Sequence, residues 1–251
     1  DVLYARLSRI GRPCMHDDLI SIVIPVYNRT RVFKKALTSV LSQTYKHLEV
    51  IVVDDGSREN VEMVVLAMQD ARVVYVRQEN KGAPSARNTG FTMSRGTYVI
   101  FWDADVVAEP SMLEKLEVAL EKHSEAAWAY SSFWWGRRLF QGRPFSAETL
   151  RSQNYIHTSA LIRREAFPGF DESLKRFQDW DLWLTMSEEG KTGVFVDEPL
   201  YHVLVESDRP SYSRWLPKFF YRLPWKWLGW SPSSIRGYEA AHDVIVRKHR
   251  L

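Results

Sequence analysis

Short apolar runs alternate with amphipathic helical segments through the first part of the chain. Four runs are continuous and rich in β-branched or aromatic residues, which is typical of strands: 21–24, 50–53, 73–76 and 98–102. Between them, apolar residues recur at helical spacing, as from Phe33 to Leu41. Strands that are apolar on both faces and alternate with helices predict an α/β fold, with a mainly parallel sheet covered on both sides.

Polar side chains follow three of these four strands. They are Tyr27 and Asn28 after the first strand, Asp54 and Asp55 after the second, and Asp103 and Asp105 after the fourth. Because crossovers between parallel strands are right-handed, the carboxyl ends of the strands share one edge of the sheet. Ligands bind at that edge, where the strand order reverses. We therefore expect these side chains to converge on one site.

Helix caps and domain limits follow from the same pattern. Thr30 and Ser57 are expected to cap the first two helices, and Ser111 with Glu114 has the sequence of a capping box.

Later elements are a strand at 126–135, a polar connection at 136–151, and a mixed region at 154–205 with one aromatic helix over 179–189. We expect four segments: a leader or added extension at 1–14, two halves at 15–107 and 108–205, and an extension at 206–251 with an aromatic and basic helical tail.

Composition and charge fit a folded protein and narrow its partners. Of 251 residues, 45% are apolar and 26% charged, and the net charge of +3 gives no reason to expect a nucleic-acid partner. The single Cys14 cannot form an internal disulfide, which fits a reducing compartment such as the cytoplasm. The first twenty residues lack the apolar stretch of a signal peptide, and the apolar run at 19–27 is too short to span a bilayer.

Asp103 and Asp105 are candidate ligands of a divalent cation. On an extended backbone, residues two apart point to the same side, with α-carbons roughly 6.5 to 7 Å apart. Carboxylates so placed can hold Mg²⁺ or Mn²⁺, with phosphate oxygens completing the coordination shell. The same sequence occurs in solvated turns, but its place on the edge that also carries Asp54 and Asp55 favours the metal site.

Two more segments are candidates for nucleotide contacts. Asp55 can accept hydrogen bonds from a nucleobase, whereas Asp54 is expected to serve the turn. The segment at 80–88 places a glycine turn before a helix that carries Arg87. A helix amino end with a guanidinium suits a diphosphate, although this signal is weak by itself.

In order and spacing, these motifs resemble those of family 2 glycosyltransferases of the GT-A fold. The resemblance rests on the segments 21–28, 52–57, 80–88 and 101–105, and it continues through 157–164, 169–172 and 178–183. It covers about residues 20 to 205. The resemblance implies a Rossmann-like nucleotide-sugar-binding half at 15–107, continuous with an acceptor-binding and catalytic-base half at 108–205.

The resemblance also implies roles for individual residues. Nucleotide-sugar contacts are implied for Pro25, Tyr27, Asp55 and Arg87, ribose or metal contact for Asp103, and metal ligation for Asp105. Asp179 is similar to the family's general base, with Asp181 as the alternative. Gln178 and Thr185 depart from the Glu and Arg that are common in the family, which bears on the acceptor site.

The reaction so implied is a metal-assisted single displacement that inverts the anomeric carbon. A bound Mg²⁺ or Mn²⁺ offsets the charge that grows on the leaving diphosphate, and the base takes the proton of the acceptor hydroxyl. The donor is expected to be a nucleotide-diphosphate sugar. UDP is expected as the carrier because it is the usual one in the family that the chain resembles. The acceptor is expected to be a glycan or a lipid-linked glycan.

Two residues near the implied site, Trp180 and His202, keep two interpretations each. Trp180 is either an acceptor contact or a core residue, while Trp183 is expected in the core. Asp181 is a second acceptor candidate. His202 either completes the metal shell or is structural, and the structural role is favoured.

The segment at 212–230 combines eight aromatic residues with four cations spaced every four positions. Such a mixture suits a membrane interface, where rings lie at headgroup depth and cations meet anionic lipid. The alternative is that these rings cover the protein's own apolar surface or a subunit contact. Pro217 and Pro224 interrupt any long helix, so short turns are expected. Docking would place the protein at the inner face of the membrane.

Other functions were weighed on the same residues. A sugar-1-phosphate nucleotidyltransferase needs a Gly- and Lys-rich loop after the first strand, where this chain has Pro25-Val-Tyr-Asn28. A glycoside hydrolase needs a protonated carboxylic acid, which a metal-holding pair does not provide. A non-catalytic sugar-nucleotide or membrane-binding subunit would be expected to lose Asp179. No G-x-G-x-x-G follows a strand, which disfavours dinucleotide enzymes.

Overall fold

The computed structural model describes residues 18–205 and 233–251. Its elements are β1 (Ile20–Val26), α2 (Thr30–Leu41), β2 (Leu48–Asp54), α3 (Val61–Leu66), β3 (Val73–Arg77), α4 (Ala83–Met93), β4 (Tyr98–Phe101), β5 (Val106–Ala108), α5 (Met112–Lys122), β6 (Ala126–Trp135), β7 (Arg138–Phe140), α6 (Ala147–Ser152), β8 (Leu161–Arg163), the 3-10 turn η1 (Arg164–Ala166), α7 (Gln178–Glu188), β9 (Thr192–Val203) and α9 (Ser233–His249). The α/β class expected from the sequence is confirmed.

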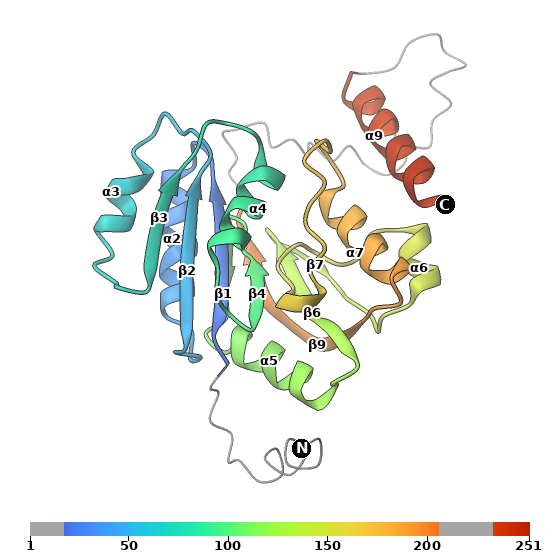
Figure 1. The fold of residues 1–251 in the computed structure, drawn as a ribbon, viewed down its shortest axis with the longest axis horizontal. Helices are drawn as coiled ribbons and strands as arrows, with labels where there is room; N and C mark the ends of the chain where they lie inside the picture. The colour runs from blue at the N-terminus through green and yellow to red at the C-terminus, as the bar shows by residue number, and fades with distance from the viewer. Residues whose placement is uncertain (1–17, 206–232) are drawn as a thin grey trace, which may run out of the picture.

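One sheet runs through the molecule in the order β3-β2-β1-β4-β8-β6-β9-β5, with β7 paired to β6 (Figure 1). The four strands of the first half are parallel, as predicted. In the second half, β8 lies antiparallel to both β4 and β6, while β9 lies parallel to β6 and antiparallel to β5. Because the sheet is continuous across residue 107, the division into two halves at that point stays a prediction.

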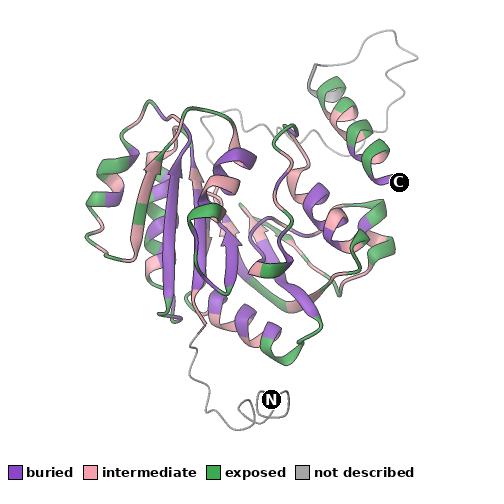
Figure 2. Cartoon of the chain, viewed as in Figure 1, coloured by how far each residue is buried: buried purple, intermediate pink, exposed green. Residues whose placement is uncertain are grey.

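Two apolar cores cover the two faces of the sheet. The central strands β1, β2 and β4 are almost entirely buried between them, whereas β3 at the edge is partly exposed (Figure 2). Alternate residues along β1 enter different cores: Ile22 and Ile24 belong to the core that includes residues of α2 and α5, and Val23 belongs to the core that includes residues of α4 and α7. This arrangement follows from the two-residue period of a strand, since successive side chains point to opposite faces.

A close approach between α4 and β1 depends on Gly90. A Cβ atom at this position would lie 2.3 Å from Cγ1 of Val23, closer than any real packing contact. Gly82, with φ of 92°, makes the turn that starts α4. The two glycines thereby bring α4, with Arg87 in its second turn, directly against the strand ends.

Three expected helix caps are wrong in detail. Asn60, not Ser57, caps α3, because its side chain accepts from the amide of Met63. Thr30 is the first residue of α2 and bonds to Glu59, and no side chain caps that helix. The capping box at Ser111 does not form, since Glu114 accepts from Thr44 instead. In each case a tertiary partner competes successfully with the local cap.

The polar connection expected at 136–151 contains two elements that the pattern did not predict, β7 and α6. At the C-terminus, α9 packs against α7 (Figure 1). The aromatic and basic segment at 212–230 lies outside the described residues, so its predicted short turns and membrane docking stay predictions. Within the described parts of the chain, no helix has the length and apolar character needed to cross a membrane.

Candidate active site

Arg87 connects the two halves of the site. Its guanidinium donates to Asp103 Oδ1 at 2.7 Å and to Oε1 of Gln178 at 2.8 Å. Asp103 directly follows the β4 region, whereas Gln178 opens α7. His157 lies close by, with Nε2 at 3.7 Å from Asp103 Oδ2. The end of β4, the helix α4 and the first turn of α7 are thus joined by a single buried side chain.

The charges around Asp103 and Asp105 act in opposite directions. Burial by itself would raise the pKa of Asp103, but the charges of Arg87 and His157 outweigh it and hold that pKa below its ordinary value. Burial and the negative charge of Asp103 raise the pKa of Asp105, although Arg29 opposes them from 2.5 Å. The site therefore carries two close carboxylates, one of which loses its proton less readily.

These two carboxylates fit a divalent cation. Both are hard oxygen donors, and the repulsion between them is what a bound cation would relieve. The parts of the chain that the structure describes hold no cluster of three or more His, Cys, Asp or Glu side chains, so the remaining ligands would have to be diphosphate or water oxygens. His202 belongs to no such cluster and stacks on Trp134, which favours the structural interpretation.

Asp54 and Asp55 differ in what binds them. Asp54 is fully buried and accepts from Tyr75 and Arg77, both at 2.8 Å, which makes it structural as expected. Asp55 accepts from the side chain of Gln78 at 2.8 Å and from the amides of Lys81 and Gly82 at 2.9 Å each. Asp55 therefore fixes the turn before α4, and its role toward a nucleobase stays a prediction.

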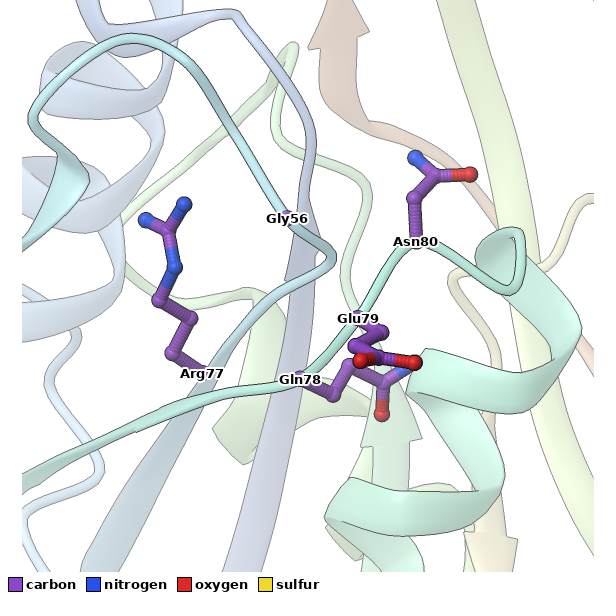
Figure 3. Close-up of a pocket in the computed structure, with 5 residues that line it drawn as sticks. All are labelled: Gly56, Arg77, Gln78, Glu79 and Asn80. Atoms are coloured by element: carbon purple, nitrogen blue, oxygen red, sulfur yellow. The ribbon is translucent and has the colours of Figure 1, made fainter.

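A pocket of about 490 Å³ opens beside this turn. Its lining residues are Gly56, Arg77, Gln78, Glu79 and Asn80 (Figure 3). The two loops that form it touch, since the side chain of Asn80 donates to the carbonyl of Asp55 at 2.9 Å. At the end of β1, Pro25 is half-buried and Tyr27 is exposed. The strand ends and the pocket thus lie at the edge where the sequence predicted a nucleotide.

Asp179 stands in the first turn of α7 with both oxygens engaged. Its Oδ2 accepts from Asn154 at 2.7 Å, and its Oδ1 accepts from the amide of Trp180 at 2.9 Å. Burial raises the pKa of this carboxyl, and the charge of His157 opposes the rise. The carboxylate is thereby held in one orientation, and a raised pKa brings it closer to the working range of a general base.

Asp181 and Trp180 are engaged by neighbours inside the protein, and their roles toward an acceptor stay predictions. Asp181 is 4% exposed and accepts from His249 and Lys248 of α9, each at 2.8 Å. Trp180 is 4% exposed, and its indole donates to the carbonyl of Leu150 at 2.7 Å. Both side chains therefore take part in the packing of α7 against its neighbours. Trp183 is fully buried, as expected.

Four side chains of this site were not assigned a role from the sequence: Arg29, Asn154, His157 and Gln178. Gln178 and His157 lie inside segments that carry the family resemblance, so the sequence pointed to their positions but not to their roles. Arg29 and Asn154 carry no local signal, because 76 and 25 residues separate them from the carboxylates that they bind. Only the folded chain brings these partners together.

The sheet, its covering helices and the carboxylates at one edge define a protein of the GT-A glycosyltransferase type. The model of the family "Glycosyl transferase family 2" matches residues 21–169, and the chain belongs to this family. A relative is an uncharacterized glycosyltransferase of Rickettsia bellii, 28% identical over 229 residues that cover 83% of this chain and 32% of the relative. The chain spans about a third of the length of this relative and of two further Rickettsia relatives, and 58% of the length of two others.

Solved structures confirm the GT-A fold. S. aureus TarS 1–349 in complex with UDP-GlcNAc matches with a TM-score of 0.66 at 18% identity, covering 81% of this chain and 63% of TarS. The mannosyltransferase PcManGT of Pyrobaculum calidifontis, in complex with GDP-Man and Mn²⁺, matches with a TM-score of 0.64 at 18% identity, covering 97% and 76%. At this identity the likeness concerns the fold.

Proposed function

We propose that this chain catalyses inverting transfer of a sugar from a nucleotide-diphosphate donor to an acceptor hydroxyl. The observation that carries the proposal is the Asp103–Arg87–Gln178 connection, because it joins the candidate metal carboxylates to the residue next to Asp179. A donor diphosphate and an acceptor hydroxyl would then meet at one place. Family membership supports the same assignment.

The donor half of the site supplies positive charge for the leaving group. Asp103 and Asp105 would hold Mg²⁺ or Mn²⁺, which offsets negative charge on the departing diphosphate when bound. Arg87 keeps Asp103 ionised and fixes its orientation through a contact at 2.7 Å. Pro25, Tyr27 and Asp55 lie along the same edge and are proposed to contact the nucleoside.

The acceptor half supplies the base. Asp179 would accept the proton of the acceptor hydroxyl as that oxygen attacks the anomeric carbon from the face opposite the diphosphate. Asn154 and the amide of Trp180 occupy one acceptor position on each carboxylate oxygen, so lone pairs remain for the hydroxyl. A single displacement of this kind needs no covalent enzyme intermediate and inverts the anomeric centre.

UDP is the proposed carrier, since TarS binds UDP-GlcNAc on a similar fold, while the GDP-Man complex of PcManGT makes GDP the second candidate. The proposed acceptor is a glycan or a lipid-linked glycan. Peripheral attachment at the inner face of a membrane through residues 212–230 is part of this proposal. A nucleotidyltransferase is disfavoured, because Pro25 and Tyr27 stand where that reaction needs a flexible phosphate loop.

The test is a thermal-shift panel of UDP-, GDP- and dTDP-sugars, each with and without Mn²⁺. A ligand that binds only the folded state adds about 2.7 kcal/mol to the free energy of unfolding at a hundredfold excess over Kd, which raises the melting temperature. One nucleotide should stabilise the chain more in the presence of Mn²⁺ than in its absence. The selected donor is then incubated with candidate acceptors, and NMR of the product should show inversion. If no sugar nucleotide stabilises the chain, the proposal is wrong.

A further inference from the structure

The two acidic residues of the candidate metal site have unlike counter-ions. Arg87, which binds Asp103, has a side chain that is only 8% exposed and a second fixed partner in Gln178. Arg29, which binds Asp105, has a side chain that is 39% exposed. Within residues 18–205 and 233–251, Asp105 is also the only carboxylate that Arg29 pairs with. The first pair is built into the core, whereas the second can be released.

The backbone around Arg29 is held firmly. The amide of Asn28 donates to Oγ of Ser57 at 3.0 Å, and the amide of Thr30 donates to Oε2 of Glu59 at 2.9 Å. These bonds fasten both neighbours of Arg29 to the loop between β2 and α3. The long side chain is therefore the part that is free to change position without moving the loop.

We propose that Arg29 is an exchangeable counter-ion of Asp105, which neutralises this carboxylate in the empty site and moves to the donor diphosphate when a divalent cation takes the carboxylate. The inference rests on the proposed function. Arg29 and a cation cannot both approach Oδ2 of Asp105, since each would occupy the same position and repel the other. A diphosphate offers the displaced guanidinium a new partner, because its planar fork matches phosphate oxygens.

This exchange has a consequence that can be measured. The cation alone must displace Arg29 without compensation, whereas the cation together with a diphosphate leaves the guanidinium paired. Arg29 should therefore weaken binding of the cation alone and increase the cooperativity between cation and nucleotide. Cooperativity is reciprocal, so it can be measured as the change in cation affinity that the nucleotide causes.

The experiment titrates MnCl₂ into the full chain by calorimetry, with and without UDP, and with GDP as a parallel arm. The parent is compared with Arg29→Ala and with Arg31→Ala. Arg31 is an exposed cation two residues along the chain, and no ion pair of it occurs among the described residues. It controls for the loss of one positive charge. Asp105→Ala, which should lose Mn²⁺ binding in every condition, identifies the site that is being titrated.

Without nucleotide, Arg29→Ala should bind Mn²⁺ about two- to fivefold more tightly than the parent, the range expected for removing one partly exposed ion pair. With UDP the difference should shrink or reverse, so UDP raises Mn²⁺ affinity less in this variant. Arg31→Ala should follow the parent throughout. Equal or weaker Mn²⁺ affinity of Arg29→Ala without nucleotide, or the same gain in Arg31→Ala, would overturn the inference and leave the proposed function standing. A parent that binds no Mn²⁺ with either nucleotide would overturn the proposed metal site together with this inference.

Discussion

Asn154 donates a hydrogen bond from its side-chain amide to Oδ2 of Asp179 at 2.7 Å, across 25 residues of sequence. Asp179 lies in α7, while Asn154 lies between α6 and β8. An amide donor fixes the carboxylate plane without supplying a proton. Asn154 is therefore a positioning residue for the candidate base.

Asp179→Asn should separate binding from chemistry. The amide cannot accept the acceptor's proton, so transfer should fall by about a hundred- to ten-thousandfold while the affinity for the sugar nucleotide is unchanged. Asn154→Ala should lower kcat by a smaller factor, again without a change in donor affinity. Calorimetry with the donor and a transfer assay measure the two quantities. Loss of donor affinity in Asp179→Asn would show that this carboxylate serves the donor instead.

The pH dependence of transfer should report the raised pKa of Asp179. A base works only when it is deprotonated, so kcat should fall as the pH drops through this pKa, which lies above the ordinary value for Asp. The main cause is burial, opposed by His157. His157→Gln removes that opposing charge, so the acidic limb of the profile should move to higher pH. A limb that stays in place would mean that another group controls the profile.

Asp181 should matter for stability. It is bound by His249 and Lys248, and removing its charge leaves the buried His249 without its shortest ion pair. Lys248 keeps a second partner in Asp171. Asp181→Asn should lower the free energy of unfolding by roughly 2–4 kcal/mol and speed amide exchange in α9. Glu188→Gln, which alters an exposed contact of the same His249, should cost less than about 1 kcal/mol. If Asp181→Asn keeps its stability and loses transfer, Asp181 is the base.

Gly90 and Gly237 offer a matched pair for the packing of α4. Both lie inside helices, where Ala is favoured over Gly by about 1 kcal/mol. A Cβ atom has open space at Gly237 but would clash with Val23 at Gly90. Gly237→Ala should therefore raise the melting temperature, and Gly90→Ala should lower stability by about 1–3 kcal/mol. Thermal melting of the two variants checks this, and a stabilised Gly90→Ala would show that α4 can move away from β1.

The segment at 212–230 lies outside the described residues, and membrane docking by it can be tested directly. Each cation near anionic lipid contributes roughly 1 kcal/mol, so binding should increase with anionic lipid and weaken with salt. Trp225→Ala combined with Trp227→Ala should reduce co-sedimentation with vesicles and spare transfer to a soluble acceptor analogue. If the parent does not bind anionic vesicles at low salt, the segment serves the protein's own surface or a subunit contact.

The sequence by itself determined the parallel half of the sheet and the edge where ligands bind. Runs such as 21–24 and 50–53 are apolar on both faces, and this property alone requires helices on both sides of a parallel sheet. The positions of Asp55, Asp103 and Asp105 after these strands follow from the same rule. These inferences hold because they depend on local periodicity and on the handedness of crossovers.

Only the tertiary structure decided which polar groups meet. Arg29 binds Asp105, Asn154 binds Asp179, and His249 of the C-terminal helix binds Asp181. Other long-range contacts took the expected cap residues away from their helices, such as the bond of Thr30 to Glu59. Likewise, the indole of Trp180 is buried and donates to the carbonyl of Leu150. A side chain's partner is set by the packing of distant elements, and a single sequence carries no local trace of that packing.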